Sequence, residues 1–527
     1  MRIGIDVGGT NTDAVLMEGR SVVASCKAPT TEDVSSGIED ALARVLAGAG
    51  VRSEAIEAVM IGTTQLTNAF VARQSLLPVG IIRAALPAAR GVPPLVDWPE
   101  ELRRLVGGDV HQVRGGVQYD GRLNAPLDED AVRRAAGAFA RQGLETVAIS
   151  SLFSPIDSSL EERVAEIVRE EMDKAVTITL SHSIGRIGLL ERENAAIMNA
   201  SLASLSRKVV SSFRRALVTL GLKAPFFISQ NDGTLMSAEF VEAYPVLTFA
   251  SGPTNSMRGA ASLAGLDNAM VADIGGTTTD FGWLEKGFPR ESSVAVDIGG
   301  VRTNFRMPDV YAMGLGGGSL VEAGAPQPQV GPRSVGYRLL SEARVFGGET
   351  LTATDLAVAA GYVTIGDPER VADLDPELVS RAIDRIHEMV AEGVDRMKTS
   401  AEPVPLILVG GGAVLLNRPI AGTSDVIVPE HASVANAIGA SIAQVGGETD
   451  RVFSYDETSR DQALADAVAE AEARALQAGA APGTLKTIDL EELPLAYVPG
   501  NAVRVKVKVA GELALAATSG SRIGGAA

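Results

Sequence analysis

One eight-residue pattern occurs twice in this chain. It reads Asp-Val-Gly-Gly-Thr-Asn-Thr-Asp at 6–13 and Asp-Ile-Gly-Gly-Thr-Thr-Thr-Asp at 273–280. Each copy follows an apolar, strand-like run, and the paired glycines permit the tight turn of a β-hairpin. A hairpin turn alone explains a single copy. Two copies, each bounded by carboxylates, predict two halves that are built on one plan.

The repeated pattern contains groups that bind phosphate and a divalent cation. Glycines let successive backbone N–H groups form a concavity that binds anions. Strand-end carboxylates next to such a concavity need a cation, and Mg²⁺ takes few carboxylates and keeps waters that contact phosphate. We therefore predict that Asp6 and Asp273 hold Mg²⁺ and that the two turns bind the phosphates of one nucleotide. The predicted phosphate-binding residues are Gly8, Gly9, Thr10, Asn11 and Thr12 in the first copy and Gly275, Gly276, Thr277 and Thr278 in the second.

Asp13 and Asp280 close the two copies and have two possible roles. They brace the hairpins through backbone N–H groups, or one of them orients a metal-bound water or a substrate N–H. The catalytic candidates are thus four aspartates, Asp6, Asp13, Asp273 and Asp280.

A third glycine element follows an apolar run near the end of the second half. The run LILV at 406–409 leads into Gly410, Gly411 and Gly412, where an adenine or ribose can lie against bare backbone. Alone, this element is also typical of an ordinary turn between a strand and a helix. The chain contains neither a Walker A motif nor GxGxxG, so a P-loop or a dinucleotide fold is not indicated.

Composition restricts the partners. The 527 residues carry a net charge of −18, which disfavours extensive electrostatic binding to nucleic acid or to an anionic membrane. Cys26 is the only cysteine, which excludes an intramolecular disulfide and fits a reducing cytosol. The sequence shows neither a leader pattern nor an apolar run of membrane-spanning length. We expect a cytoplasmic protein without a nucleic-acid or membrane partner.

Strand-like and helix-like segments alternate along the first part of the chain, as expected for an α/β fold. Strands are predicted at 58–62, 145–152 and 175–181, and helices at 128–142 and 158–173. The Pro-, Gly- and Arg-rich stretch 76–125 permits no assignment, and 188–220 resembles one long helix. Beyond 450, an acidic helix and alternating strands predict a small α+β appendage, followed by a disordered tail at 518–527. The expected division is 1–185, 186–446 and 447–527.

The order of these motifs resembles the actin, hexokinase and heat-shock chaperone ATPase superfamily. That superfamily combines two phosphate hairpins, an adenosine-binding glycine motif and two helices that cross between lobes. The resemblance implies a two-lobed, actin-like ATPase fold of the ribonuclease H-like α/β class, with ATP and Mg²⁺ as cofactors. It places the crossing helices near 190–205 and 433–445.

Further motifs resemble one branch, the hydantoinase/oxoprolinase family with its ATP-dependent hydantoinase A-type subunit. They include GTTQLTNA at 62–69, Leu-Phe-Ser at 152–154, Ser-Gly-Pro at 251–253, GLGGGS at 314–319 and TATDLAVAAGYV at 352–363. The resemblance adds Gly316 and Gly317 to the nucleotide-binding residues. The substrate-side candidates are Thr63, Thr64, Asn68, Glu191 and Arg192. Asn68 is also explained as an ordinary helix or turn residue, Glu191-Arg192 as a structural ion pair, and His182 as a structural histidine or a base.

The chain departs from the family pattern at a few positions. Ile61 stands where many members have His, and Thr-Asn-Ser at 254–256 replaces Ala-Gly-Gly. These departures leave the nucleotide motifs intact and bear on the substrate and the partner subunit.

The family resemblance implies an ATP-dependent amidohydrolase subunit. Mg-ATP would phosphorylate the carbonyl oxygen of a cyclic amide (a hydantoin, 5-oxoproline or a lactam) and so activate it for hydrolysis. A second hydrolase subunit and an oligomeric assembly are the expected partners. Two alternatives stay open: a carbonyl-phosphorylating subunit of an acetone-carboxylase-like enzyme, and an ATP-controlled regulator, because fold alone does not determine function.

Overall fold

A computed structural model describes residues 1–8, 11–29, 34–172, 175–292, 295–305, 307–323, 327–496 and 498–514. Gly9 and Thr10 of the first turn, and the expected tail at 518–527, lie outside the described residues. The chain divides into two compact units, Met1–Ala443 and Gln444–Ala527, and each unit is described separately.

The first unit contains a six-stranded sheet that begins with the first predicted hairpin. Its strand order is β10-β9-β4-β1-β2-β3, with β1 antiparallel to β2 and parallel to β4. The alternate apolar side chains of β1 pack against α1 (Val34–Ala49) and α7 (Ala203–Thr219) on one face. The strands are β1 Arg2–Val7, β2 Asn11–Glu18, β3 Ser21–Pro29, β4 Ala58–Thr63, β9 Phe226–Ser229 and β10 Leu235–Ser237.

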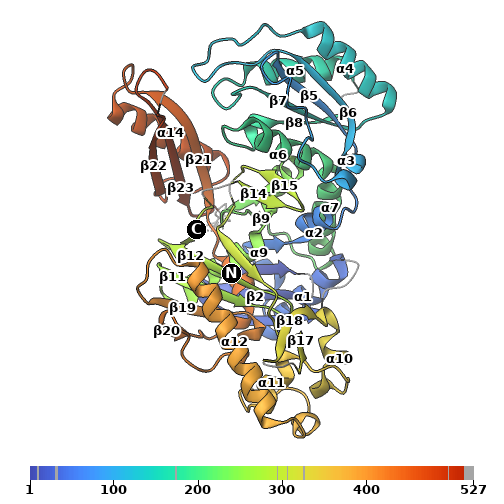
Figure 1. Ribbon diagram of the computed structural model, residues 1–527, viewed down its shortest axis with the longest axis vertical. Coiled ribbons are helices and arrows are strands. Elements are labelled where there is room, and N and C mark those ends of the chain that lie inside the picture. Colours follow the sequence, from blue (N-terminus) through green and yellow to red (C-terminus); the bar gives the residue numbers. More distant parts are fainter. Residues whose placement is uncertain are drawn as a thin grey trace, which may run out of the picture. The chain divides into compact units, whose positions relative to one another are not determined.

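A second sheet in the same unit repeats this plan with the second hairpin. Its order is β13-β12-β11-β19-β20, with β16 paired to β12 and β11 parallel to β19. Helix α12 (Pro376–Met397) lies beside this sheet (Figure 1). This helix is amphipathic, and its apolar face is buried in the core that it shares with the sheet. The strands are β11 Ala269–Ile274, β12 Thr279–Glu285, β13 Phe288–Pro289, β16 Val310–Met313, β19 Val404–Val409 and β20 Thr423–Ile427. The predicted two-lobed α/β fold is thereby confirmed.

A third, parallel sheet is inserted between β4 and β9, in order β6-β5-β7-β8. Its strands are β5 Val79–Leu86, β6 Gly107–Arg114, β7 Thr146–Ser151 and β8 Thr177–Leu180. Helices α4 (Glu129–Gln142) and α5 (Ser159–Glu171) pack against it (Figure 1). Two of these strands come from the stretch that permitted no assignment, because β5 is buried along its length and lacks alternation.

The helices that cross between the two lobes differ from the expected pair. The segment 188–220 forms α6 (Leu189–Ser201) and α7, separated at Leu202, and α6 packs on the inserted sheet. The helix that meets α13 (Ala435–Ser441) is α9 (Ser251–Ala264). The expectation for 190–205 is therefore wrong, and the one near 433–445 corresponds to α13.

The crossing of α9 and α13 is close because each helix has a glycine at the contact. A Cβ on Gly259 would lie 1.9 Å from the carbonyl oxygen of Ala435, and one on Gly439 would lie 1.8 Å from that of Asn255. Apolar residues of α9 pack on the second sheet, whereas those of α13 pack on the first. The crossing thus joins the two sheets.

The boundary between the sheets also differs from the expected division at 185/186. β9 and β10 follow that position in the chain but pair within the first sheet. The first lobe therefore extends beyond residue 185, and the inserted sheet interrupts it.

Shorter elements complete the first unit. The helices are α2 Gln65–Val71, α3 Glu100–Val106, α8 Ala238–Ala243, α10 Leu339–Glu342 and α11 Ala353–Ala359. Two small hairpins are formed by β14 Val296–Ile298 with β15 Val301–Thr303 and by β17 Ser319–Glu322 with β18 Gln329–Ser334.

The second unit is a small α+β domain. Strands β21 (Val445–Ser454), β22 (Lys486–Pro494) and β23 (Ala502–Gly511) form an antiparallel sheet in the order β21-β23-β22. Helix α14 (Arg460–Gln477) places an alanine stripe on this sheet, close to Gly447. Among the residues that the structure describes, no helix has the length and apolar character needed to cross a bilayer.

We expect Gly259→Ala and Gly439→Ala to destabilise the first unit, because each added methyl group collides with a backbone carbonyl. Overpacking of this kind costs about 1–3 kcal/mol, and more where backbone cannot move. Gly48→Ala in α1 is the matched control, since a Cβ there meets open space and alanine favours a helix. Midpoints of urea unfolding would measure the effect. Equal midpoints for all three variants would contradict the close crossing.

Candidate functional site

The two hairpins each place two carboxylates directly opposite one another. Asp6 pairs with Asp13 across β1 and β2, and Asp273 pairs with Asp280 across β11 and β12. Like charges in such cross-strand pairs are destabilising unless another group compensates them. The repeated pattern therefore builds two local concentrations of negative charge at the ends of corresponding strands.

Both hairpins contribute to one cavity of about 390 Å³. Of the predicted site residues, those that line it are Asp6, Gly8, Asn11, Asp13, Asp273, Gly275, Gly276, Gly317, Gly410, Gly411 and Gly412. Additional lining residues, which the sequence did not indicate, include Lys27, Ser256, Leu340, Phe346, Thr354, Ile365 and Asn436. The two strand ends that are far apart in the sequence thus face one shared space.

Five other predicted nucleotide or catalytic residues do not line this cavity. Thr12 is buried, and Thr277 and Thr278 are exposed on the second turn. Gly316 packs against that turn, because a Cβ there would come within 2.6 Å of Gly276. Asp280 is half-buried and lies opposite Asp273 on the neighbouring strand.

The glycines of the third element are required by close packing against the second hairpin. Gly410 has φ of 83°, and a Cβ on it would lie 2.3 Å from Oδ1 of Asp273. A Cβ on Gly411 would meet nothing within 4 Å, so this residue presents bare backbone to the cavity. Leu340, Phe346 and Ile365 add apolar side chains to the same cavity. Bare backbone and apolar side chains suit the flat faces of a nucleoside.

The crossing helices supply a hydrogen-bond donor to each hairpin. Nδ2 of Asn436, on α13, donates to Asp6 Oδ2 at 2.8 Å and to Asp13 Oδ2 at 3.1 Å. Ser256 Oγ, on α9, donates to Asp273 Oδ2. Lys27 Nζ lies 2.6 Å from Asp13 Oδ1. No sequence motif marks Asn436 or Lys27 as a site residue, because only tertiary contacts bring them to the hairpins. Ser256 belongs to the segment 254–256, where the chain departs from the family pattern.

Residues in register form a polar row that ends at Gly62 and spans four strands of the first sheet. The row consists of Asp6, Asp13 and Lys27 on β1, β2 and β3, with Gly62 of β4 opposite Asp6. On β9, Ser229 follows Ile228, whose partner on β4 is Ile61. A Cβ on Gly62 would lie 2.5 Å from Asn255 Nδ2 and 2.6 Å from Asp6 Oδ1.

Several buried polar atoms at one end of this row lack partners. Among the described residues, Asp6 Oδ1, Ser229 Oγ and both amide atoms of Asn255 form no hydrogen bond. Unpartnered buried polar atoms are costly, at roughly 1–3 kcal/mol each. Their concentration around Asp6 indicates that a polar group such as an ordered water or a cation belongs there.

The electrostatic consequence is a set of carboxylates that resist ionisation. Burial, with the charges of Asp13 and Asp273, raises the pKa of Asp6 to about 7. Burial and the charge of Asp273 raise the pKa of Asp280 to about 7. Burial also raises the pKa of Asp273, although the Ser256 hydrogen bond and Lys27 act in the opposite direction. A bound cation would reverse these shifts.

The residues fit a magnesium nucleotide better than an all-protein metal site. Within the described ranges, no group of three or more His, Cys, Asp or Glu side chains is arranged to hold a metal ion. Mg²⁺ needs only one or two carboxylates when phosphate and water complete its shell. Asp6 has one unpartnered oxygen, and Asp6 and Asp273 share a glycine-lined cavity.

Three substrate-side candidates lie near this site but do not line the cavity. Thr63 is buried; its Oγ1 accepts from the backbone N–H of Gln65, and its carbonyl accepts from Ser251 Oγ. Thr64 precedes α2, and the exposed Asn68 donates to its Oγ1 at 3.3 Å. These contacts fit a helix start at least as well as a substrate site.

The other two candidates lie in a structural network. Arg192 is buried and donates to Ser181 Oγ at 2.9 Å and to the carbonyls of Arg186 and Ser151 at 3.0 and 2.5 Å. Glu191 lies 3.6 Å from Arg302. Neither Glu191 nor Arg192 lines the cavity, so the structure favours a structural role for them over a substrate-binding role. The imidazole Nδ1 of His182 lies 2.7 Å from the buried Glu161, which also favours a structural role.

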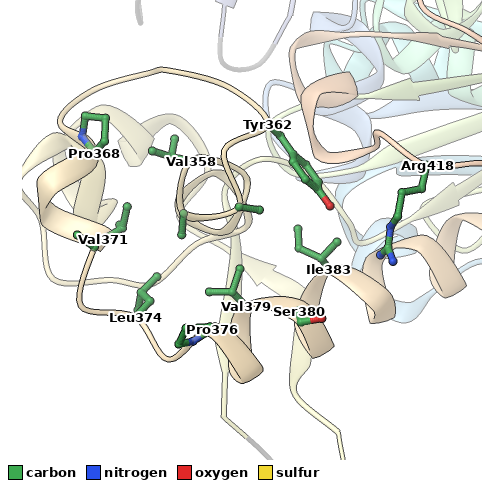
Figure 2. Close-up of a pocket in the computed structure, with 13 residues that line it drawn as sticks. Val358, Tyr362, Pro368, Val371, Leu374, Pro376, Val379, Ser380, Ile383 and Arg418 are labelled. Atoms are coloured by element: carbon green, nitrogen blue, oxygen red, sulfur yellow. The ribbon is translucent and has the colours of Figure 1, made fainter.

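A larger cavity, of about 580 Å³, lies elsewhere in the first unit, between α11 and α12. Figure 2 shows that its wall is mainly aliphatic, with Tyr362 and Arg418 at one side. None of the predicted site residues lines it. Size alone therefore does not identify the site; the aspartates and glycines do.

The fold and the paired hairpins define a two-lobed α/β protein in which two equivalent glycine turns face one cavity. Residues 2–172 match the hydantoinase/oxoprolinase N-terminal region, and residues 192–448 match the hydantoinase/oxoprolinase domain. The chain belongs to the hydantoinase/oxoprolinase family.

Named relatives in this family carry out different reactions. The chain is 29% identical over 396 residues to the acetophenone carboxylase gamma subunit of Aromatoleum aromaticum, covering 68% of this chain and 53% of that protein. It is 29% identical over 391 residues to the caprolactamase subunit alpha of Pseudomonas jessenii, covering 69% and 55%. The chain thus spans about half the length of these relatives.

Two solved structures share the fold along nearly the whole chain. ATP-dependent caprolactamase from Pseudomonas jessenii superposes with a TM-score of 0.77 at 22% identity, and nucleotide-free acetone carboxylase with 0.67 at 21%. Each comparison covers 97% of this chain and 88% of the other.

We predict that the nucleotide-free protein loses stability as pH rises. Asp6 and Asp280 have folded-state pKa values of about 7 against an ordinary 3.8. Between these values the folded chain holds more protons than the unfolded chain, so the free energy of unfolding falls with increasing pH. Thermal unfolding from about pH 5 to about pH 8 would measure this fall.

The control for this prediction is the Asp6→Asn/Asp280→Asn variant, whose midpoint should decline less over the same range. Added Mg²⁺ should raise the wild-type midpoint most at the alkaline end. Parallel declines for wild type and variant would show that these carboxyls titrate normally.

Proposed function

We propose that this chain is the ATP-dependent subunit of an amidohydrolase that activates a cyclic amide, such as a hydantoin, 5-oxoproline or a lactam. One observation carries the proposal: the carboxylates Asp6 and Asp273, from two equivalent glycine hairpins, line the same cavity. Family membership adds that related proteins named for amide hydrolysis are ATP-dependent. Phosphoryl transfer requires mainly positioning and charge neutralisation, which this arrangement supplies.

Each part of the cavity has a proposed role toward Mg-ATP. Asp6 and Asp273 would hold the metal ion through their carboxylate oxygens. Gly8 and Asn11 at the first turn, and Gly275 and Gly276 at the second, would lie against the phosphates. Gly411, with the apolar side chains of Leu340 and Phe346, would contact the nucleoside.

The chemical purpose of bound ATP is to overcome amide resonance. Transfer of the terminal phosphoryl group to the amide oxygen would break the bond to ADP and leave the amide carbon open to water. Addition of water and cleavage of the C–N bond would open the ring as an acyl phosphate, and a second water would release phosphate and the carboxylate. Water and ATP are the only co-reactants that this sequence needs.

A second candidate is carbonyl phosphorylation within a carboxylase. The observation that favours it is the equal identity, 29%, to the acetophenone carboxylase gamma subunit and to caprolactamase subunit alpha. Phosphorylation of an enol oxygen would need the same nucleotide site. The two candidates differ in the acceptor and in the requirement for bicarbonate.

A partner subunit is part of the proposal. Both relatives are named as subunits, and this chain spans about half of each. We propose that a second subunit completes hydrolysis after the phosphoryl transfer.

The test is a phosphate-release assay with Mg-ATP and matched acceptors. Hydantoin, 5-oxoproline and caprolactam represent cyclic amides, and acetone and acetophenone, each with and without bicarbonate, represent ketones. Stimulation by an amide supports the proposal, whereas bicarbonate-dependent stimulation by a ketone supports the carboxylase. If nucleotide binds but no acceptor stimulates its turnover, an ATP-controlled regulator is favoured.

We further predict that Ser256→Ala lowers Mg-ATP turnover by about 10–100-fold, as typical for groups that orient a metal ligand. The Ser256 hydroxyl holds Asp273, and its loss frees that carboxylate to rotate. Ser211→Ala, on the exposed face of α7, is the control for the same chemical change. Turnover and the Mg²⁺ concentration for half-maximal rate would be measured together. An unchanged Mg²⁺ requirement would exclude a metal-orienting role.

A further inference from the structure

Lys27 lines the proposed nucleotide cavity, although neither the repeated pattern nor the glycine motifs indicate it. It lies on β3 directly opposite Asp13, at the end of the polar row across the first sheet. Its side chain is 39% exposed, whereas that of Asp13 is 5% exposed. The lysine therefore emerges from a buried acidic site into the cavity that it lines.

The cavity lining carries more acidic than basic side chains, and this lysine supplies its positive charge. Among the described residues that line the cavity, Asp6, Asp13 and Asp273 are acidic and Lys27 is the only basic one. A bound triphosphate adds several further negative charges, and a single divalent cation does not neutralise all of them. Phosphoryl-transfer sites compensate such charge with lysine or arginine in addition to metal.

The hydrogen bonding of Asp13 explains how the lysine is held. Its Oδ1 contacts Lys27 at 2.6 Å, and its Oδ2 accepts from Asn436 at 3.1 Å. Both oxygens are therefore in contact with a positively charged or N–H group, which leaves Asp13 poorly placed to bind metal. A lysine ammonium has three donors, so the ion pair with Asp13 still leaves donors for a ligand.

We propose that Lys27 contacts the terminal phosphate of the bound nucleotide and that Asp13 is the positioning residue that holds Lys27 there. The inference rests on the proposed nucleotide site and extends it to a residue and a role. A compact ammonium on a flexible stem suits a phosphate that changes position during transfer. Asp13 and Asp280 then differ in function, although the repeated pattern makes them equivalent, because Lys27 pairs with Asp13 and not with Asp280.

The test compares ATP and ADP affinity in the absence of any acceptor. Calorimetric titration of Lys27→Met with each nucleotide in Mg²⁺ should show ATP affinity reduced by about tenfold to a hundredfold, the range expected for a lost charged hydrogen bond. ADP affinity should change little, because ADP lacks the terminal phosphate. Lys27→Arg should retain part of the ATP affinity. Lys223→Met, at an exposed position, is the matched control and should bind both nucleotides as wild type does.

Two outcomes would overturn the inference: unchanged ATP affinity in Lys27→Met, or equal losses for ATP and ADP. If the wild-type protein binds neither nucleotide, the proposed function itself fails, so the two failures are distinguishable. Lys27→Met leaves the buried Asp13 without its cation, so thermal unfolding is measured first to check that this variant folds. The Lys27→Met/Asp13→Asn variant removes both charges and should show the same preferential loss of ATP. Preserved ATP selectivity in that variant would equally contradict the inference.

Discussion

The close crossing of α9 and α13 is the contact on which the site depends. Gly259 and Gly439 allow the two helix backbones to touch, so that each helix can pack on its own sheet while meeting the other. The same crossing places Asn436 against Asp6 and Ser256 against Asp273. Larger residues at the two glycines would separate the helices and move these donors away from the carboxylates. The crossing of α9 and α13 therefore determines both the packing of the two sheets and the geometry of the site.

The paired, buried carboxylates lower the stability of the folded chain, and a bound ligand would compensate them. Asp6 and Asp13 receive compensation from Lys27 and Asn436, but Asp6 keeps an unpartnered oxygen and a pKa of about 7. Asp280 also has a pKa of about 7, because burial and Asp273 act on it together. Protein interiors avoid such groups unless function requires them. The destabilised carboxylates are thus consistent with a site that is completed by a cation and a polyphosphate.

Much of this architecture was predictable because local signals and tertiary structure agree. The apolar runs before Gly-Gly form β1 and β11 in the expected hairpins, and the periodic segment at 128–142 forms α4, with its cap at Asp128. Prediction failed where burial removes periodicity. β5 is buried on both faces, and α9 is rich in small residues because it is enclosed between two sheets. Neither segment shows the alternation or the amphipathic stripe that sequence patterns detect.

In the candidate site, too, some residues were predictable from local patterns and others were not. The strand-end aspartates and the glycines have local roles that spacing reveals, and Asp6, Asp273 and Gly410–Gly412 do share a cavity. Glu191 and Arg192 also looked like site residues, yet the buried Arg192 braces carbonyls near the inserted sheet. A motif shared within a family thus marks a structural requirement as readily as a catalytic one. Lys27 and Asn436 come from strands and helices that have no distinctive pattern, and only the fold brings them to Asp13.

The departure at 254–256 has a physical meaning in this setting. Where a glycine pair would leave open backbone, Asn255 lies over Gly62 beside Asp6, and Ser256 binds Asp273. Both side chains therefore lie beside Asp6 and Asp273, the two carboxylates that line the shared cavity. The glycines that line the same cavity, Gly275, Gly276 and Gly411, stand outside the departure. In the proposed nucleotide site, the departure would therefore act on the carboxylates rather than on the glycine turns.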